Sequence, residues 1–341
     1  MNSIVRQPAI APAPGQLIEI RDGVFWAQLR LPFRLNHVNI YLLDEGDGWV
    51  VVDTGIGDSP TVAAWEVLLA GPLAGRPVTR VVCTHHHPDH VGMAGWLIAR
   101  FGATLHMPEA EFLLSQHYSN RPGAIDGKAF FDLYAANGMP PDQIAQVLSD
   151  GHDYQRRLTG LPDAFVRLED GDEFVVNGRT FEVLTGGGHS PDQAMLLCRA
   201  EGFFLCADQV LPRISPNVGV VAHEPLGDPL GRFLTSLRDI RRRAPGDVVC
   251  YPGHDWPFDT LHERIAQLLA HHEQRCAVLS DACVSEPKSA AELTPKLFPA
   301  LAGDHQISFG FMETLSHIHY LLGRGELALS EAAPVRRFRR V

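Results

Sequence analysis

The chain has 341 residues, of which 45% are hydrophobic, and its 29 basic and 40 acidic residues give a formal net charge of −11. This length permits a large core and two domains, and the acidic balance makes nucleic acid an unfavourable partner. The sequence has no run of about 18 apolar residues, so it predicts no transmembrane helix and no membrane partner.

Six cysteines occur without paired spacing, and Cys83, Cys198, Cys206 and Cys250 fall in predicted buried strands. In such positions cysteine acts as a small hydrophobic residue. We expect a cytoplasmic protein, because unpaired cysteines suit a reducing compartment.

Residues 1–16 lack a compact apolar segment and predict a flexible N-terminal tail rather than a signal peptide. From residue 17 onward, apolar and polar residues alternate and predict sheet strands that end at Asp53. Ser59-Pro60 then opens a helix that continues to Leu69, with proline at the tolerated first position.

The most informative segment is residues 84–92, which contains His85, His87, Asp89 and His90 in the pattern His-x-His-x-Asp-His. A short apolar strand precedes it and a helix is predicted after it, over residues 91–101. The cluster therefore lies where α/β folds place their sites, at the end of a strand. Burying it is costly unless a cation lies among the side chains, and imidazole and carboxylate suit zinc, iron or manganese. A solvated loop or a single structural metal site would be the alternatives.

Residues 108–161 predict a helical insertion, with breaks at Pro122-Gly123 and at residues 138–141. We expect most of its apolar side chains to pack the insertion onto the body of the protein. Some of them could face a substrate as a lid.

Three further side chains that can bind metals follow β-like runs: His189, Asp208 and His254. Three glycines precede His189 and allow a tight turn beside a ligand. Each residue alone would more often belong to an ordinary turn, but four strand ends with the same chemistry indicate one shared site.

The end of the chain predicts a helix over residues 260–281, a capping box at Ser289–Glu292, a helix over residues 307–322, and a hairpin from residues 327–329 and 335–338. Three helices and a hairpin resemble a winged helix, for which DNA binding is implied by analogy alone. The last of these helices has no lysine or arginine. We therefore expect either a structural module or one that forms a homodimer.

Together these motifs resemble the metallo-β-lactamase superfamily over residues 17–258, including its Asp-Thr-Gly turn at residues 53–55. The resemblance implies an α/β fold: a four-layer αβ/βα sandwich over residues 17–258, followed by a small helical, winged-helix-like domain over residues 259–341. It also implies that the insertion at residues 108–161 lies over the metals.

The resemblance further implies two divalent transition metals, zinc first, with iron or manganese as alternatives. Three residues would hold the first metal, three the second, and one would bridge them. In that order they are His85, His87 and His189, then Asp89, His90 and His254, then Asp208. All seven positions are filled, which is similar to glyoxalase II, the lactonases and the processing nucleases.

This set predicts a hydrolase in which a hydroxide between two metals attacks a thioester, ester or lactone carbonyl. Asp89 and Asp53 are the catalytic candidates: Asp89 as a proton carrier or a ligand only, Asp53 as an acceptor behind a metal-bound histidine or a turn cap. His37, Tyr118 and His223 are candidate contacts to a small acyl substrate. RNA phosphodiester cleavage is the alternative, and a non-catalytic metal-binding regulatory protein is the third hypothesis.

Overall fold

The structure is a computed structural model, and it describes all of the chain except residues 1–9, 34, 122–123, 125–126, 150–153, 302 and 331–333. The first nine residues of the predicted tail and the predicted break at Pro122-Gly123 therefore lie outside the described residues.

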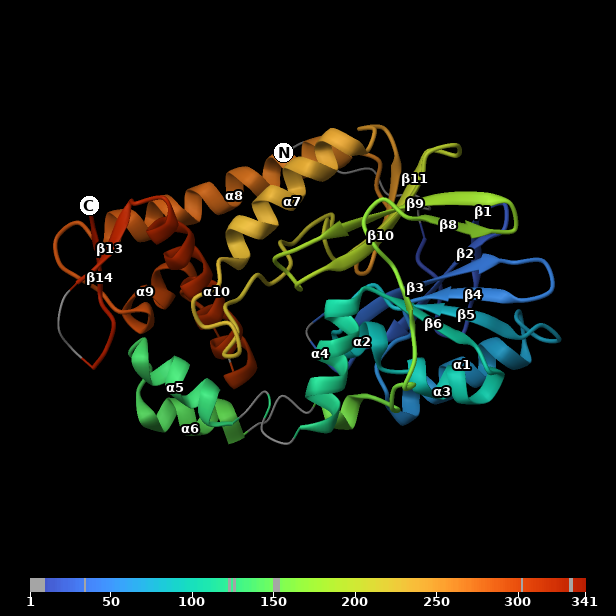
Figure 1. Cartoon of the computed structure of the whole chain (residues 1–341), viewed down its shortest axis with the longest axis horizontal. Helices are drawn as coiled ribbons and strands as arrows, with labels where there is room; N and C mark the ends of the chain where they lie inside the picture. Colours follow the sequence, from blue (N-terminus) through green and yellow to red (C-terminus); the bar gives the residue numbers. More distant parts are fainter. Residues whose placement is uncertain are drawn as a thin grey trace.

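The first sheet has seven strands that lie side by side in chain order (Figure 1). They are β1 (Ile18–Arg21), β2 (Val24–Arg30), β3 (His37–Asp44), β4 (Trp49–Val52), β5 (Val78–Val82), β6 (Thr104–Met107) and β7 (Val166–Arg167). The strands up to β4 pair antiparallel, and those from β4 onward pair parallel.

Helices cover the outer face of this sheet, because parallel strands need crossover connections. Helix α1 (Ser59–Ala70) buries Trp65 there, and α3 (Ala94–Phe101) buries Leu97. The single helix predicted over residues 91–101 is in fact two, since α2 (Pro88–Val91) ends before Gly92 and α3 begins after Met93.

The second sheet has five strands in the order β12-β11-β10-β9-β8. Their bounds are β8 (Glu173–Val176), β9 (Arg179–Gly186), β10 (Gln193–Cys198), β11 (Phe203–Ala207) and β12 (Val249–Pro252). Strand β10 shows the two-residue period of a buried strand. Leu196 faces the core between the two sheets, whereas Met195 and Leu197 face the core under α7 (Pro229–Arg243) and α8 (Leu261–Ala282). The predicted four-layer αβ/βα sandwich is thereby confirmed.

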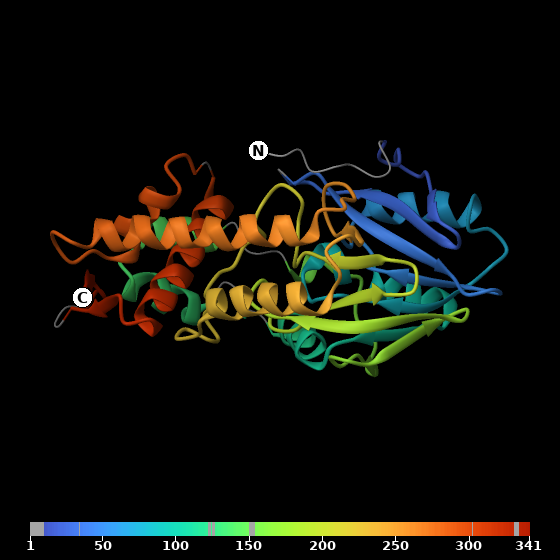
Figure 2. The ribbon, with the colours of Figure 1, turned by 90° about the horizontal axis from the view of Figure 1, so that it is seen from above.

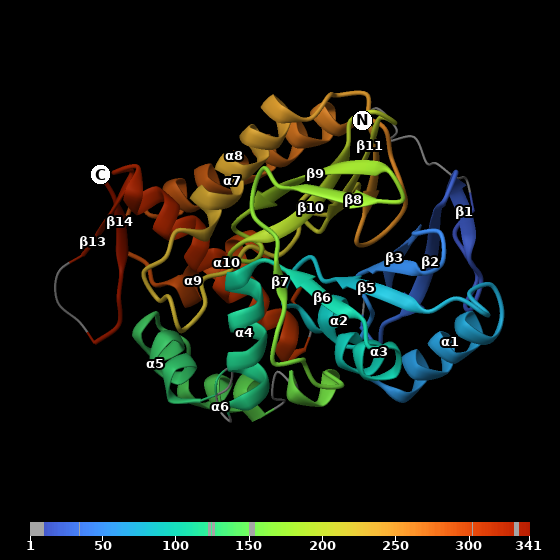
Figure 3. The same ribbon diagram turned by 45° about the vertical axis from the view of Figure 1, so that its right-hand side comes forward.

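The insertion between β6 and β7 contains α4 (Glu109–Asn120), α5 (Lys128–Ala136), α6 (Pro141–Ser149) and a short 3₁₀ turn (Gln155–Arg157). The insertion was expected to lie over the metals, and only part of it does. Helix α4 lies beside the predicted metal residues, whereas α5 and α6 pack against α10 (Asp304–Gly323) at the C-terminal end of the molecule (Figures 1 and 3). The Tyr134 hydroxyl contacts the Ser308 hydroxyl at 2.7 Å in this interface. The apolar faces of α5 and α6 join the C-terminal core instead of forming a lid.

The C-terminal segment has the predicted order of elements, with shifted ends. Helix α8 runs from the second sheet to the far end of the molecule (Figure 2). The capping box at Ser289 and Glu292 begins α9 (Ala290–Leu297), as predicted. Helix α10 starts three residues earlier than expected, and the final hairpin pairs β13 (Leu327–Leu329) with β14 (Phe338–Arg340).

All six cysteines are buried and unpaired. Among the residues that the structure describes, none of the helices combines the length and apolarity that crossing a membrane requires.

Candidate metal centre

The seven predicted ligand residues follow the ends of four strands, and the two facing sheets bring these ends together. His85 follows β5, His189 follows β9, Asp208 follows β11 and His254 follows β12. Close approach of these turns requires glycine at residue 253, because a Cβ atom there would lie 2.2 Å from Asp208 Oδ1.

The first group consists of His85, His87 and His189, whose ligand atoms lie within 4.8 Å of one another. His87 Nδ1 lies 2.9 Å from His85 Nε2 and 3.1 Å from His189 Nε2. Three imidazoles from two turns therefore converge on one point.

The second group consists of Asp89, His90 and His254. Asp89 Oδ2 lies 3.4 Å from His254 Nε2 and 3.7 Å from His90 Nε2.

Asp208 lies between the two groups. Its Oδ2 atom is 3.1 Å from His254 Nε2, 3.5 Å from His90 Nε2 and 3.4 Å from His189 Nε2. Because one oxygen contacts members of both groups, Asp208 occupies the position predicted for a bridging carboxylate.

In three of these imidazoles, the Nδ1 atom points away from the centre and donates a hydrogen bond to an oxygen atom 2.8 Å away. The acceptors are the Asp53 carboxylate for His90, the Asn217 carbonyl for His189 and the His37 carbonyl for His254. A carbonyl or carboxylate oxygen only accepts, so each Nδ1 carries a proton and Nε2 is the nitrogen that is left to bind a metal.

Two of the inward atoms in the described site lack such partners. Within the described part of the chain, buried His90 Nε2 and Asp208 Oδ1 have no hydrogen-bond partner. Lone pairs that converge in a buried site repel one another unless a cation lies among them. This donor set of imidazoles and carboxylates fits transition-metal ions.

The electrostatics differ between the histidines. Burial opposes a charge on His90 and His254, but the neighbouring carboxylates outweigh it and raise both pKa values. Burial, reinforced by the neighbouring imidazoles, holds the pKa values of His85 and His87 well below the usual range, so both rings are neutral. Burial opposes the charge on Asp208, but His254 and His90 outweigh it and hold the pKa of Asp208 well below its usual value.

Asp53 lies behind His90 rather than facing the centre. Its carboxylate also accepts from the Thr84 amide at 2.8 Å and the Thr84 hydroxyl at 2.9 Å. Its φ of 60° is in the left-handed region that non-glycine residues rarely adopt. This geometry suits the predicted acceptor role, which is a positioning role and not a catalytic one.

A small pocket of about 70 Å³ adjoins the first group. Besides His87 and His189, its walls include Leu114, Tyr118, Val220, Val221, His223 and Arg232. The Tyr118 hydroxyl contacts His223 Nδ1 at 3.0 Å, so the structure brings together two of the three predicted substrate contacts.

The third predicted contact, His37, does not line this pocket. Its Nε2 accepts from the Asp255 amide at 3.0 Å, and its carbonyl holds His254. His37 therefore supports the second group from behind.

Sequence reasoning missed Glu111, which is fully buried on α4. Its carboxylate accepts from the amides of His86 at 3.0 Å and Asp192 at 2.7 Å, and from His86 Nδ1 at 2.6 Å. It thus ties the histidine loop to the turn that carries His189. No local pattern distinguishes Glu111 from the exposed Glu109 of the same helical turn.

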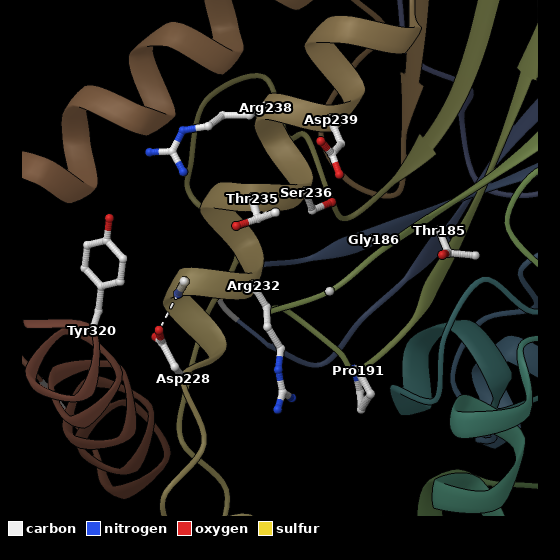
Figure 4. A pocket seen from close by; sticks show the side chains of 12 residues that line it. Thr185, Gly186, Pro191, Asp228, Arg232, Thr235, Ser236, Arg238, Asp239 and Tyr320 are labelled. Atoms are coloured by element: carbon white, nitrogen blue, oxygen red, sulfur yellow. Dashed lines mark hydrogen bonds between the residues drawn. The ribbon is translucent and has the colours of Figure 1, made fainter. Parts of the chain in front are cut away.

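A larger hollow of about 660 Å³ borders the same turn on the side of α7 (Figure 4). Thr185, Arg238 and Tyr320 lie on its walls. The structure describes all seven predicted ligand residues, and none of them lines this hollow. Pro191 and Arg232 line both hollows, which are therefore neighbours.

Comparisons with known proteins identify the family and the fold. Residues 34–254 match the family described as the metallo-beta-lactamase superfamily, and residues 276–341 match the metallo-beta-lactamase-like C-terminal domain. The probable metallo-hydrolase YqjP of Bacillus subtilis is 24% identical, over 88% of this chain and 92% of that protein. The atrochrysone carboxyl ACP thioesterase AgnL7 of Paecilomyces divaricatus is 24% identical over 77% of this chain, which spans 65% of that relative's length.

Two solved structures are similar over almost the whole chain. A beta-lactamase domain protein from Burkholderia ambifaria has a TM-score of 0.91 and 35% identity, with 98% of each chain covered. A metallo-beta-lactamase family protein from Thermus thermophilus has a TM-score of 0.81 and 30% identity, covering 95% of this chain and 100% of that one. With the ligand-bearing strand ends, the fold and both domain matches in agreement, this chain belongs to the metallo-β-lactamase superfamily of metallo-hydrolases.

Proposed function

We propose that this protein is a dinuclear metal hydrolase that cleaves a thioester, ester or lactone of a small acyl substrate. The observation that carries the proposal is the position of Asp208 Oδ2, within 3.5 Å of ligand atoms from both groups. The first group would hold one metal, the second group the other, and Asp208 both. Zinc is the first choice, with iron or manganese as alternatives.

Two metals bound there would supply a hydroxide nucleophile near neutral pH and polarise the scissile carbonyl. The chain's own residues do the rest. The Asp89 side chain is 18% exposed, against 2% for His254, so its carboxylate can take a proton and pass it to solvent. Burial raises the pKa of Tyr118, which keeps its hydroxyl protonated and able to donate to a substrate oxygen in the pocket.

The pocket walls support an acyl substrate. Leu114, Val220 and Val221 provide apolar surface for an acyl chain beside the first group. Pro191 and Arg232 also border the larger hollow, so a long leaving group could extend from the metal centre along α7. A relative is named as a thioesterase, and we therefore place thioesters first.

RNA cleavage is disfavoured by charge. The chain carries a net charge of −11, and α10 contains neither lysine nor arginine. A polyanion needs basic residues that replace its counterions.

We also propose that the protein works in the cytoplasm, with its six cysteines reduced. The helices α8–α10 with the β13–β14 hairpin would form a winged-helix-like module that joins two copies of the chain. The order of its elements supports the winged-helix-like fold. The absence of lysine and arginine from α10 supports a role in joining copies of the chain over nucleic-acid binding.

The test is metal analysis followed by a substrate panel. After loading with zinc, iron or manganese in turn, we expect two metals per chain. The loaded enzyme should hydrolyse thioesters, aryl esters or lactones faster than bis-aryl phosphates. One metal or none would reject the dinuclear centre, and preferential phosphodiester cleavage would reject the acyl substrate.

A further inference from the structure

A second cluster of buried ionisable side chains lies between α8 and α10. His272 and Arg275 come from α8, and Glu313 and His317 come from α10. His272 and His317 are fully buried, and Glu313 is 7% exposed. We call these four residues the α8–α10 cluster.

Three members of this cluster, His272, Glu313 and His317, lie close enough together to hold a metal ion. Their polar atoms, however, already have protein partners. His317 Nδ1 donates to the Glu313 carbonyl at 2.8 Å, and its Nε2 lies 3.1 Å from His272 Nδ1. Arg275 donates to Glu313 Oε1 at 2.9 Å. A cluster satisfied in this way is suited to fixing neighbouring structure.

The neighbouring structure is the loop of residues 215–220 between β11 and α7, which the cluster holds at two points. The Ser215 hydroxyl contacts His272 Nε2 at 2.9 Å, and the Asn217 side-chain amide donates to Glu313 Oε2 at 3.2 Å. The Val220 amide also donates to the Met312 carbonyl of α10 at 3.1 Å. This loop has no regular secondary structure, so such contacts determine its position.

The same loop contacts the metal centre. The Asn217 carbonyl accepts the Nδ1 proton of His189 at 2.8 Å. A continuous chain of hydrogen bonds therefore runs from Arg275 and Glu313 through Asn217 to a residue of the first group.

We propose that Glu313 is a positioning residue for the metal centre: by holding Asn217, it fixes the carbonyl that orients His189 and so raises the affinity for the first metal. The inference rests on the proposed function, because it takes His189 as a metal ligand. Partners behind a metal-bound histidine typically change metal affinity by about 10–100-fold.

The experiment measures zinc affinity of the full chain by competition with a chelator at pH 8. Asn217→Asp is nearly isosteric, removes the amide donor and places a second carboxylate beside Glu313. We expect it to weaken the first metal's binding by about 10-fold or more, with the second metal little affected. Glu313→Ala should have a similar effect, whereas Glu313→Gln should restore most of the affinity because its amide oxygen still accepts from Asn217.

Glu273→Ala is the matched control. It also breaks an arginine–glutamate pair between α8 and the end of α10, since Glu273 lies 3.1 Å from Arg324, but it does not contact the loop. It should leave both affinities unchanged. Nitrogen NMR of the imidazoles gives a readout independent of activity, because the protonated Nδ1 of His189 should lose its single environment in Asn217→Asp and Glu313→Ala but keep it in Glu273→Ala.

If Asn217→Asp and Glu313→Ala bind the first metal as the unaltered chain does, or if Glu273→Ala weakens it equally, the inference is wrong. An unaltered chain that binds two metals would leave the proposed function standing in that case. An unaltered chain that binds no metal would reject the proposed function itself, and a third bound metal would reassign the α8–α10 cluster.

Discussion

At the scale of single residues, the two groups of proposed ligands differ in what orients them. The Asp53 carboxylate stands behind His90, whereas backbone carbonyls stand behind His189 and His254. A carboxylate makes the imidazole that it contacts more basic than a neutral carbonyl does. His90 should therefore be the strongest imidazole donor of the second group.

Asp208 should matter to both metals and His254 to one. Asp208→Ala removes the carboxylate oxygen placed between the groups and should lose most of both metals. Losing the metals would remove several kcal/mol of transition-state stabilisation. We therefore expect kcat/KM to fall by about 10³-fold. His254→Ala should keep the first metal and lose the second. Elemental analysis of the two variants decides this, and a normal metal content in Asp208→Ala would refute the ligand assignment.

Tyr118→Phe tests the substrate contact. The variant keeps the ring that lines the pocket and removes only the hydroxyl that contacts His223. We expect kcat to fall by about 10²–10³-fold, as on loss of one positioned donor, with both metals retained. Steady-state kinetics with a thioester measures the change, and an unaltered kcat would show that the Tyr118–His223 pair is structural only.

At the scale of secondary-structure elements, α4 anchors the histidine loop through a single buried carboxylate. Glu111→Ala would leave the amides of His86 and Asp192 without an acceptor, at a cost of about 3 kcal/mol in unfolding free energy. Glu109→Ala is the control in the same helical turn, because its ion pair with Arg167 is exposed. Urea unfolding of both variants should separate them, and equal stabilities would contradict a structural role for Glu111.

The contact between α8 and α10 should make stability depend on pH. Burial lowers the pKa of His317 to about 4 from its usual 6.5, with Arg275 and His271 acting in the same direction. The unfolded chain then takes up this proton first, so acidification from pH 6.5 to 4 favours unfolding.

His317→Asn removes this titration. The decrease in unfolding free energy between pH 7 and pH 4 should therefore be smaller by about 3 kcal/mol than in the unaltered chain. Urea unfolding with a chelator present measures it without a contribution from metal loss. An unchanged pH dependence would mean that His317 is protonated in the folded protein at pH 5.

At the scale of the whole molecule, the C-terminal segment is not a separable module. One apolar core contains Phe130 and Ile144 of the insertion, Phe233 of α7, Leu268 of α8 and Leu315 of α10. A chain ending at residue 258 would expose the inner face of this core, and we expect it to be insoluble.

Self-association is better tested by substituting exposed residues than by deleting the C-terminal segment. Val278 and Val284, at the end of α8, are 44% and 62% exposed. Replacing both by Glu should turn a dimer into a monomer in sedimentation equilibrium, because two charges would be buried in the interface. Leu226→Glu, at a site that is 77% exposed outside the C-terminal segment, should leave the dimer intact. A dimer that survives the double substitution would place the interface elsewhere.

The amino-acid sequence alone predicted the seven proposed ligand positions and, through the family resemblance, the layers of the fold. Each of those residues directly follows a short apolar strand or lies in one loop after it, and such patterns are local. The helices of the C-terminal segment could also be predicted from the sequence. The capping box at Ser289 and the apolar periodicity of α8 and α10 are local patterns that span only a few helical turns.

Tertiary structure alone decided what supports the ligands. Glu111 meets the amide of Asp192, 81 residues away, and Asn217 meets Glu313, 96 residues away. The apolar faces of α5 and α6 indicated burial but not the partner, which proved to be α10. Apolar burial is non-directional and a hydrogen bond depends on where two distant segments meet, so neither partner can be read from the pattern of one segment.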